Sequence, residues 1–213
     1  MAKTNNISNG MVKGGQKLST SNYEKHSTKN PIGRLFLNNF LNTVVTTIRP
    51  LHIKNILDAG CGEGFTLTRL SKEKIGDSLE GVDFSKDAIE IGKKMYPNLK
   101  LGQADINKLP YRNNSFDLVI ATEVLEHVDY PRRALRELIR VSNKYVLVTV
   151  PNEPWFTVQR ILRGKNLKQL GRHPEHVQYW SSQKFVEFVR REKIKIEVKK
   201  LPFPWTMLLL KKK

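Results

Sequence analysis

The chain has a single cysteine, Cys61, among its 213 residues. One cysteine excludes an internal disulfide and a zinc site built from cysteines. Long apolar runs are also lacking, because the densest stretch near an end, residues 207–210, is far shorter than the roughly 20 residues of a membrane span. The N-terminus has no apolar segment of the kind that secretory signals contain. We therefore expect a cytoplasmic protein without a transmembrane segment, in a reducing setting.

Acidic residues are few relative to basic ones, and the formal net charge is +17. Residues 31–154 are nearly balanced, whereas residues 155–213 hold 15 basic and 4 acidic residues. This asymmetry suggests an anionic partner near the C-terminal quarter, such as nucleic acid, a phosphorylated or carboxylated substrate, or a lipid surface. Solubility explains the charge equally well, because the basic residues are spread through helix and strand patterns.

The length and the composition, 39% hydrophobic and 27% charged, are those of one soluble globular domain. Residues 1–22 are rich in Asn, Ser, Thr, Gly and Lys, and they predict a flexible N-terminal arm. The folded domain is expected over residues 23–213. Residues 152–180 have no clean period and predict an inserted cap over the site.

Strand and helix patterns alternate through the domain. Alternation of this kind predicts an α/β fold, an open and mostly parallel sheet with helices on both faces. The last two strands are joined by Pro-Phe-Pro, so we expect them to form an antiparallel pair. The expected strands lie at residues 53–57, 79–84, 99–103, 116–121, 145–150, 194–201 and 205–210, and the expected helices at 31–48, 65–74, 86–95, 131–141 and 181–191.

A glycine-rich turn follows the first strand, at residues 58–64 (DAGCGEG). Glycines permit a tight turn and a close approach of the backbone to a ligand. The dinucleotide fingerprint needs Gly or Ala at position 65, so Phe65 argues against NAD or FAD. Asp83 ends the second strand, 19 residues after Gly64, near the offset at which an acid binds ribose hydroxyls. Phe84 beside it could pack on a base.

Four segments occur together in one order: residues 56–65 (ILDAGCGEGF), 81–85 (GVDFS), 104–110 (ADINKLP) and 115–120 (SFDLVI). This series resembles the class I S-adenosylmethionine-dependent methyltransferases, above all the branch with the quinone-biosynthesis O-methyltransferases. The resemblance implies a Rossmann-like, three-layer α/β/α fold whose seven-stranded sheet has an antiparallel last strand, and S-adenosylmethionine as the cofactor.

The resemblance also implies which residues bind that cofactor. Asp58 and the glycine turn would hold the methionine end, Asp83 the ribose, and Asp105 with Ile106 the adenine. In relatives the arm folds over the cofactor, so Tyr23 is a candidate for closing the pocket. The implied cofactor-binding residues are Asp58, Gly60, Cys61, Gly62, Gly64, Asp83, Phe84, Asp105, Ile106 and Thr122.

Directly after the fourth strand come Glu123, Glu126 and His127, at positions i, i+3 and i+4. If the segment is helical, all three project to one side and form an oxygen-rich site for a divalent cation such as Mg²⁺. The segment is similar to those of ubiquinone-type O-methyltransferases and small-RNA 2′-O-methyltransferases. That similarity implies a fourth metal ligand, His176, with His173 as the alternative. Without a metal, His127 and Glu123 are the candidate catalytic residues, and a purely structural role also stays open.

These observations predict an enzyme that transfers a methyl group to a small-molecule acceptor, on oxygen. The acceptor would be anionic or aromatic, because basic and aromatic side chains occur in the predicted cap. An RNA 2′-O-methyltransferase is the first alternative, favoured by the net charge, although no separate RNA-binding module is recognisable. A non-catalytic cofactor-binding protein on the same fold is the second alternative.

Overall fold

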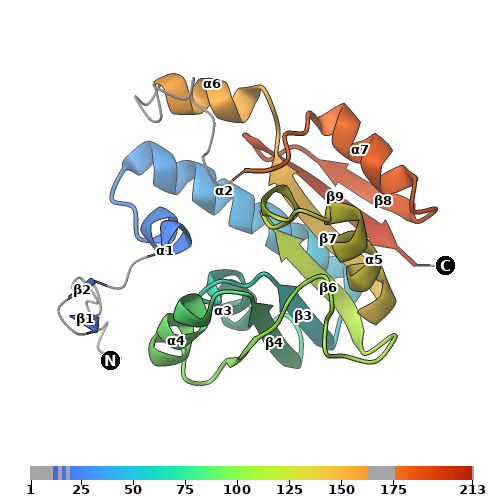
Figure 1. Cartoon of the computed structure of the whole chain (residues 1–213), viewed down its shortest axis with the longest axis horizontal. Coiled ribbons are helices and arrows are strands. Elements are labelled where there is room, and N and C mark those ends of the chain that lie inside the picture. The colour runs from blue at the N-terminus through green and yellow to red at the C-terminus, as the bar shows by residue number, and fades with distance from the viewer. Residues whose placement is uncertain (1–11, 14–15, 18–19, 163–175, 213) are drawn as a thin grey trace.

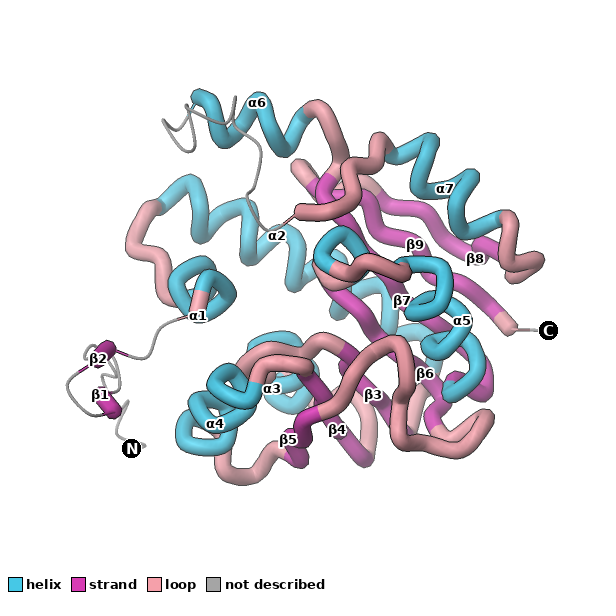
Figure 2. The backbone as a smooth tube through the Cα atoms, in the orientation of Figure 1, coloured by secondary structure: helices cyan, strands magenta, loops and turns pink. Residues whose placement is uncertain are grey.

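The computed structural model describes residues 12–13, 16–17, 20–162 and 176–212, and the structural statements below concern these residues. Seven strands form one sheet in the order β5-β4-β3-β6-β7-β9-β8, surrounded by helices (Figures 1 and 2). The strands are β3 (Asn55–Ala59), β4 (Ser78–Asp83), β5 (Lys100–Gln103), β6 (Phe116–Thr122), β7 (Ser142–Pro151), β8 (Lys195–Lys200) and β9 (Trp205–Lys211). A separate pair joins β1 (Val12–Lys13) to β2 (Gln16–Lys17).

The pairing of the strands confirms the predicted fold class. The five strands from β3 to β7 all run parallel to one another. Strand β9 is antiparallel to both β7 and β8. Parallel strands need crossover helices, and the observed helices supply them. They are α1 (Ser21–His26), α2 (Pro31–Ile48), α3 (Phe65–Lys72), α4 (Lys86–Met95), α5 (Pro131–Val141), α6 (Trp155–Leu162) and α7 (Ser182–Arg190).

The central strand β6 divides the core into two layers. Its buried side chains alternate, so that Leu118 and Ile120 belong to the cluster that α2 covers. Val119 and Ala121 belong to the cluster that α5 and α7 cover on the opposite face. A strand buried on both faces reads as a continuous apolar run, which is how the sequence predicted it. Figure 1 shows α5 and α7 on the near side of the sheet.

Helix caps account for several of the element boundaries. Asn30 accepts a hydrogen bond from the Gly33 amide at the start of α2, which has Pro31 in its first turn. Ser85 caps α4 in the same way, and the predicted cap Ser181 bonds the Lys184 amide at the start of α7. These local signals explain why most predicted elements agree with the observed ones within a few residues.

The arm and the cap are described only in part. Thr20 caps the short helix α1, which spans the predicted boundary between arm and domain at residues 22 and 23. The predicted cap contains α6 and residues 176–180, and residues 163–175 lie outside the described part. Among the helices described, none combines the length and the apolar character that crossing a bilayer requires.

Gly92 on α4 lies against the glycine turn, and substitution there tests that contact. A Cβ at this position would lie 2.6 Å from the Glu63 carbonyl oxygen. Gly92→Ala is expected to lower the free energy of unfolding by about 1–3 kcal/mol through overpacking, against a gain of about 1 kcal/mol in helix propensity. Thermal unfolding measures the change. The exposed neighbour Lys93→Ala is the control and should stay within about 0.5 kcal/mol of the wild type; equal stability of all three proteins would refute the contact.

Candidate active site

The glycine turn lies at the carboxyl end of β3 and is fixed to the next strand. The amides of Gly60 and Cys61 both donate to the Val82 carbonyl, at 2.7 and 3.0 Å. Gly60 has φ of +86°, in the left-handed region that favours glycine. A Cβ on Gly60 would also lie 2.3 Å from a methyl of Val124. Both its backbone conformation and the close approach of Val124 therefore require glycine at position 60.

Asp83 stabilises this turn from the end of β4. One of its carboxylate oxygens accepts from the Gly62 amide and the other from the Ser85 amide, each at 2.8 Å. Each oxygen can accept a further hydrogen bond. Asp83 also lines the large cavity above the sheet. Its position thus suits the binding of vicinal hydroxyls while it holds the turn in shape.

Asp58 precedes the turn and is completely buried. Neither carboxylate oxygen has a hydrogen-bond partner among the described residues. Burial, with a smaller effect of the Asp83 charge, raises the pKa of Asp58 to about 8. A buried acid of this kind is stabilised in its ionised form when a cation lies nearby. Its surroundings therefore fit a ligand that carries positive charge at the turn.

A single cavity of about 1540 Å³ extends over the turn. Most of the residues implied as cofactor-binding line it, whereas Asp58 and Gly64 do not. Cys61 is buried, which raises the pKa of its thiol and argues against a reactive role. Those that line the cavity are Gly60, Cys61, Gly62, Asp83, Phe84, Asp105, Ile106 and Thr122.

Four aromatic side chains from elements other than the turn line the cavity, and we call them its aromatic section. Phe36 and Phe40 come from α2, Phe156 from α6 and Trp205 from the start of β9. The Phe40 and Trp205 rings pack with their centroids 4.8 Å apart. Aromatic walls with a few polar groups are typical of small-molecule sites. The cavity thus combines a polar section at the turn with an apolar section beside it.

Helix α1 covers the turn through contacts that the sequence did not predict. Thr20 and Asn22 both donate to the carboxylate of Glu63, which is completely buried in the turn. His26 stacks on Phe65 with ring centroids 4.2 Å apart, and burial lowers its pKa to about 3. Tyr23, the residue expected to close the pocket, does not line the cavity.

Glu123 differs from its predicted arrangement because the segment after β6 is not an α-helix. Glu123 has φ of +57°, and only Leu125–His127 form a short 3₁₀ helix. The Glu123 carboxylate accepts from the Trp205 indole at 2.6 Å and pairs with the Lys25 ammonium. Burial lowers the pKa of Lys25 to about 8, against the opposing effect of Glu126. Both Lys25 and Trp205 are site residues that the sequence analysis missed.

Glu126, His127 and His176 form a compact group at the same end of the sheet. One ligand atom from each lies within 4.8 Å of the others, and Glu123 is not part of this group. The amides of Val177 and Gln178 donate to the Glu126 carbonyl, which brings His176 to the site. Burial raises the pKa of Glu126 to about 8, and its carboxylate has no hydrogen-bond partner among the described residues. His173 lies outside the described residues.

Comparisons with known proteins agree with this geometry. Residues 57–147, which include the turn, Asp83 and the Glu126–His127 segment, match the family described as methyltransferase domain. Residues 57–147 are therefore similar in sequence to a methyltransferase domain. A mitochondrial ubiquinone biosynthesis O-methyltransferase of Candida albicans is 34% identical over 132 residues, 54% of this chain and 38% of that protein. A probable S-adenosylmethionine-dependent methyltransferase of Mycobacterium tuberculosis is 29% identical over 109 residues, 50% of this chain and 39% of that protein.

Solved structures show the same fold for the methyltransferase domain. The methyltransferase domain of bacterial CtHen1 superposes with a TM-score of 0.67 and 22% identity, covering 83% of this chain and 100% of that one. The chain spans about two-fifths of the length of the two curated relatives above. The resemblance to S-adenosylmethionine-dependent methyltransferases is therefore confirmed, and the acceptor is not identified by it.

Asp83→Ala tests whether Asp83 belongs to the expected cofactor site. The substitution removes a charged acceptor for ribose hydroxyls and also the bond to the Gly62 amide. We expect it to weaken the binding of S-adenosylhomocysteine by about 1–3 kcal/mol, measured by calorimetry. Asp87→Ala removes an exposed acid four residues away and serves as the control. Equal affinity of Asp83→Ala and wild type would contradict the role given to Asp83.

Proposed function

We propose that this chain transfers the methyl group of S-adenosylmethionine to an oxygen atom of a small-molecule acceptor. The observation that carries the proposal is the continuity of the cavity, which joins the glycine turn to the aromatic section and to His127 and His176. Glu126 is buried next to these two histidines and does not itself line the cavity. Sites for one small ligand usually measure about 300–1,000 Å³. At about 1540 Å³, the cavity has room for a cofactor and an acceptor side by side.

The residues present fit the cofactor at its two distinctive ends. The orphaned carboxylate of Asp58 favours the positive charge of the amino-acid end, and Asp83 suits the ribose hydroxyls. S-adenosylmethionine supplies an electrophilic methyl group on a sulfonium that leaves readily. The protein then has to align the acceptor oxygen with that methyl group and to exclude water. Helix α1 and the aromatic residues of α2 would close the cavity for this purpose.

An acceptor hydroxyl must also lose its proton or have its anion stabilised. We propose that Glu126, His127 and His176 serve this step by holding a divalent cation such as Mg²⁺. The buried and unpartnered carboxylate of Glu126 supports the proposal, as does the mixed oxygen and nitrogen donor set. A bound cation would supply positive charge for the acceptor oxygen. If no cation binds, His127 is the candidate base, and Glu123 is held away from that task by Lys25 and Trp205.

RNA 2′-O-methylation is the second candidate function. The same three residues favour it, because the segment is similar to that of small-RNA 2′-O-methyltransferases. The aromatic section of the cavity favours the small acceptor instead, since Phe36, Phe40 and Trp205 line it. A ribose hydroxyl within an RNA chain needs an open path for the flanking nucleotides. A direct comparison of acceptors therefore separates the two functions.

The activity test is a screen of acceptors with cofactor labelled in the methyl group. We expect transfer to the oxygen of small catechols and phenols, and none to single-stranded RNA oligonucleotides of mixed sequence. Mass spectrometry identifies the methylated atom. Label transferred to RNA alone would replace the first function with the second. If the cofactor binds but no acceptor is methylated, the result would support a non-catalytic cofactor-binding protein.

The cation is tested by His176→Asn together with chelation. We expect a chelator to reduce transfer at least about 10-fold, Mg²⁺ to restore it in the wild type, and His176→Asn to reduce activity to a similar extent. His52→Asn is the matched control, because His52 is exposed outside the cavity, and Asn tolerates its φ of +48°. Activity that resists chelation would contradict the cation and leave His127 as the base.

A further inference from the structure

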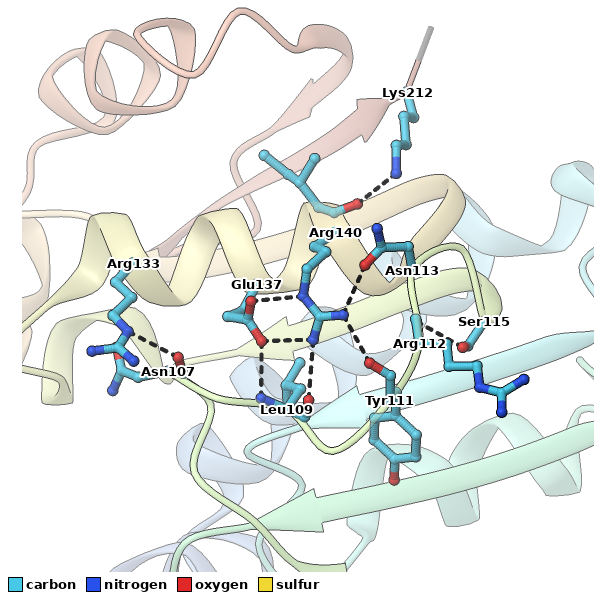
Figure 3. A network of polar contacts seen from close by, with 11 residues as sticks. Asn107, Leu109, Tyr111, Arg112, Asn113, Ser115, Arg133, Glu137, Arg140 and Lys212 are labelled. Atoms are coloured by element: carbon cyan, nitrogen blue, oxygen red, sulfur yellow. Dashed lines mark hydrogen bonds and ion pairs between the residues drawn. The ribbon is translucent and has the colours of Figure 1, made fainter.

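Helix α5 carries four arginines, and three of them have anionic partners. Arg132 and Arg136 each bind the carboxylate of Glu192 at 2.7 Å. Arg140 pairs with Glu137 and also donates to the backbone at residues 109 and 111 (Figure 3). Each of these three side chains therefore has an ion-pair partner within the protein, and Arg132 and Arg136 share theirs.

Arg133 is the exception among them. Its Nε donates to the Asn107 carbonyl at 3.0 Å, and Figure 3 shows it apart from the Arg140 network. No carboxylate among the described residues lies within ion-pair distance of it, although its charge helps to lower the pKa of Glu137 and Asp129 lines the same cavity. Arg133 itself lines the cavity, whereas Arg136 does not. An arginine fixed through Nε presents its two terminal nitrogens as a fork.

The anion that fits this fork does not belong to the cofactor. S-adenosylmethionine has one anionic group, the carboxylate of its methionine end, which the proposed binding mode places at the glycine turn. Arg133 instead contacts Asn107, two residues after Asp105, which is assigned to the adenine. An anion at Arg133 must therefore come from the other occupant of the cavity, the acceptor.

An aromatic side chain lies next to Arg133 in the cavity wall. Tyr130 immediately precedes α5, lines the cavity and is 67% exposed. An exposed aromatic ring beside a cation suits an acceptor that carries both a ring and a negative charge. His127 lies three residues earlier in the same segment, so this region adjoins the Glu126–His127–His176 group.

We propose that Arg133 and Tyr130 form a recognition site for the carboxylate of an aromatic acceptor. The site rests on the proposed function, because it presumes that the second occupant of the cavity is a methyl acceptor. Arg133 would bind the carboxylate with both terminal nitrogens, and Tyr130 would pack on the ring. These two residues select the acceptor and take no part in the transfer itself.

The experiment compares two acceptors that differ only in charge, 3,4-dihydroxybenzoate and 3,4-dihydroxybenzamide. Their affinities for protein saturated with S-adenosylhomocysteine are measured by calorimetry, and their methylation rates are measured separately. We expect the wild type to bind the carboxylate at least about 10-fold more tightly than the amide. Arg133→Gln should remove this preference, with a higher KM for the carboxylate and little change in kcat.

Three further variants make the result specific. Arg136→Gln removes a neighbouring positive charge outside the cavity and should keep the preference for the carboxylate. Arg133→Lys keeps the positive charge but lacks the two terminal nitrogens of the fork, so it should retain only part of the preference for the carboxylate. Tyr130→Ala should weaken the binding of both compounds by a similar factor. Unchanged thermal unfolding midpoints show that each variant is folded.

The outcomes distinguish failure of the recognition site from failure of the proposed methylation of small acceptors. A charge preference that depends on Arg133 but occurs without methylation of either compound would support the recognition site and refute methylation of these acceptors. Equal binding of the two compounds by the wild type, or equal losses in Arg133→Gln and Arg136→Gln, would overturn the recognition site. The recognition site would also be overturned if Arg133→Gln weakened the binding of an RNA oligonucleotide and left the binding of both small compounds unchanged.

Discussion

The close backbone approach at the glycine turn is the constraint on which the site depends. The turn is confined on three sides, by Val124 from the segment after β6, by Gly92 on α4 and by Asn22 on α1. Any side chain at Gly60 would collide with the first of these, and any at Gly92 would collide with the turn itself. In this confined turn the amides of Gly60 and Cys61 donate to the Val82 carbonyl on β4, and the Gly62 amide donates to Asp83. The cavity above it takes its shape from that arrangement.

Buried acids are the second determinant of the site. Asp58 and Glu126 lie beneath and beside the cavity with raised pKa values near 8, and burial is the main cause in both. Desolvated carboxylates without partners are costly in the free protein and gain most from a bound cation. Glu63 and Glu123 instead have partners on α1 or at its N-cap, namely Thr20 and Asn22 for Glu63 and Lys25 for Glu123. The same helix that covers the turn therefore supplies part of its charge balance.

The sequence predicted the sheet, and most of the residues expected to bind the cofactor line one cavity, because both depend on local signals. Apolar runs, helix caps and the order of four motifs are all visible along the chain, and the seven strands with an antiparallel last strand follow from the resemblance. The arrangement of Glu123 could not be predicted, since a positive φ at a non-glycine residue breaks the helical spacing assumed for Glu126 and His127. Lys25 and Trp205 were missed because they reach Glu123 from 98 and 82 residues away in the chain. Contacts of that kind leave no periodic trace.

The net charge of +17 and the acidic cavity have different effects on a ligand. Charge on the surface attracts anions of every class over about a Debye length, roughly 8–10 Å, and salt weakens that attraction. The cavity by itself favours cations, because carboxylates outnumber the ammonium and guanidinium groups that line it, which are those of Lys25 and Arg133. The carboxylates are those of Glu24, Glu63, Asp83, Asp105, Glu123 and Asp129. An anionic group can be accepted there only beside a cation that no internal acid neutralises. Glu123 already binds Lys25, whereas Arg133 forms no ion pair among the described residues, so Arg133 is the position that we propose for an anionic acceptor.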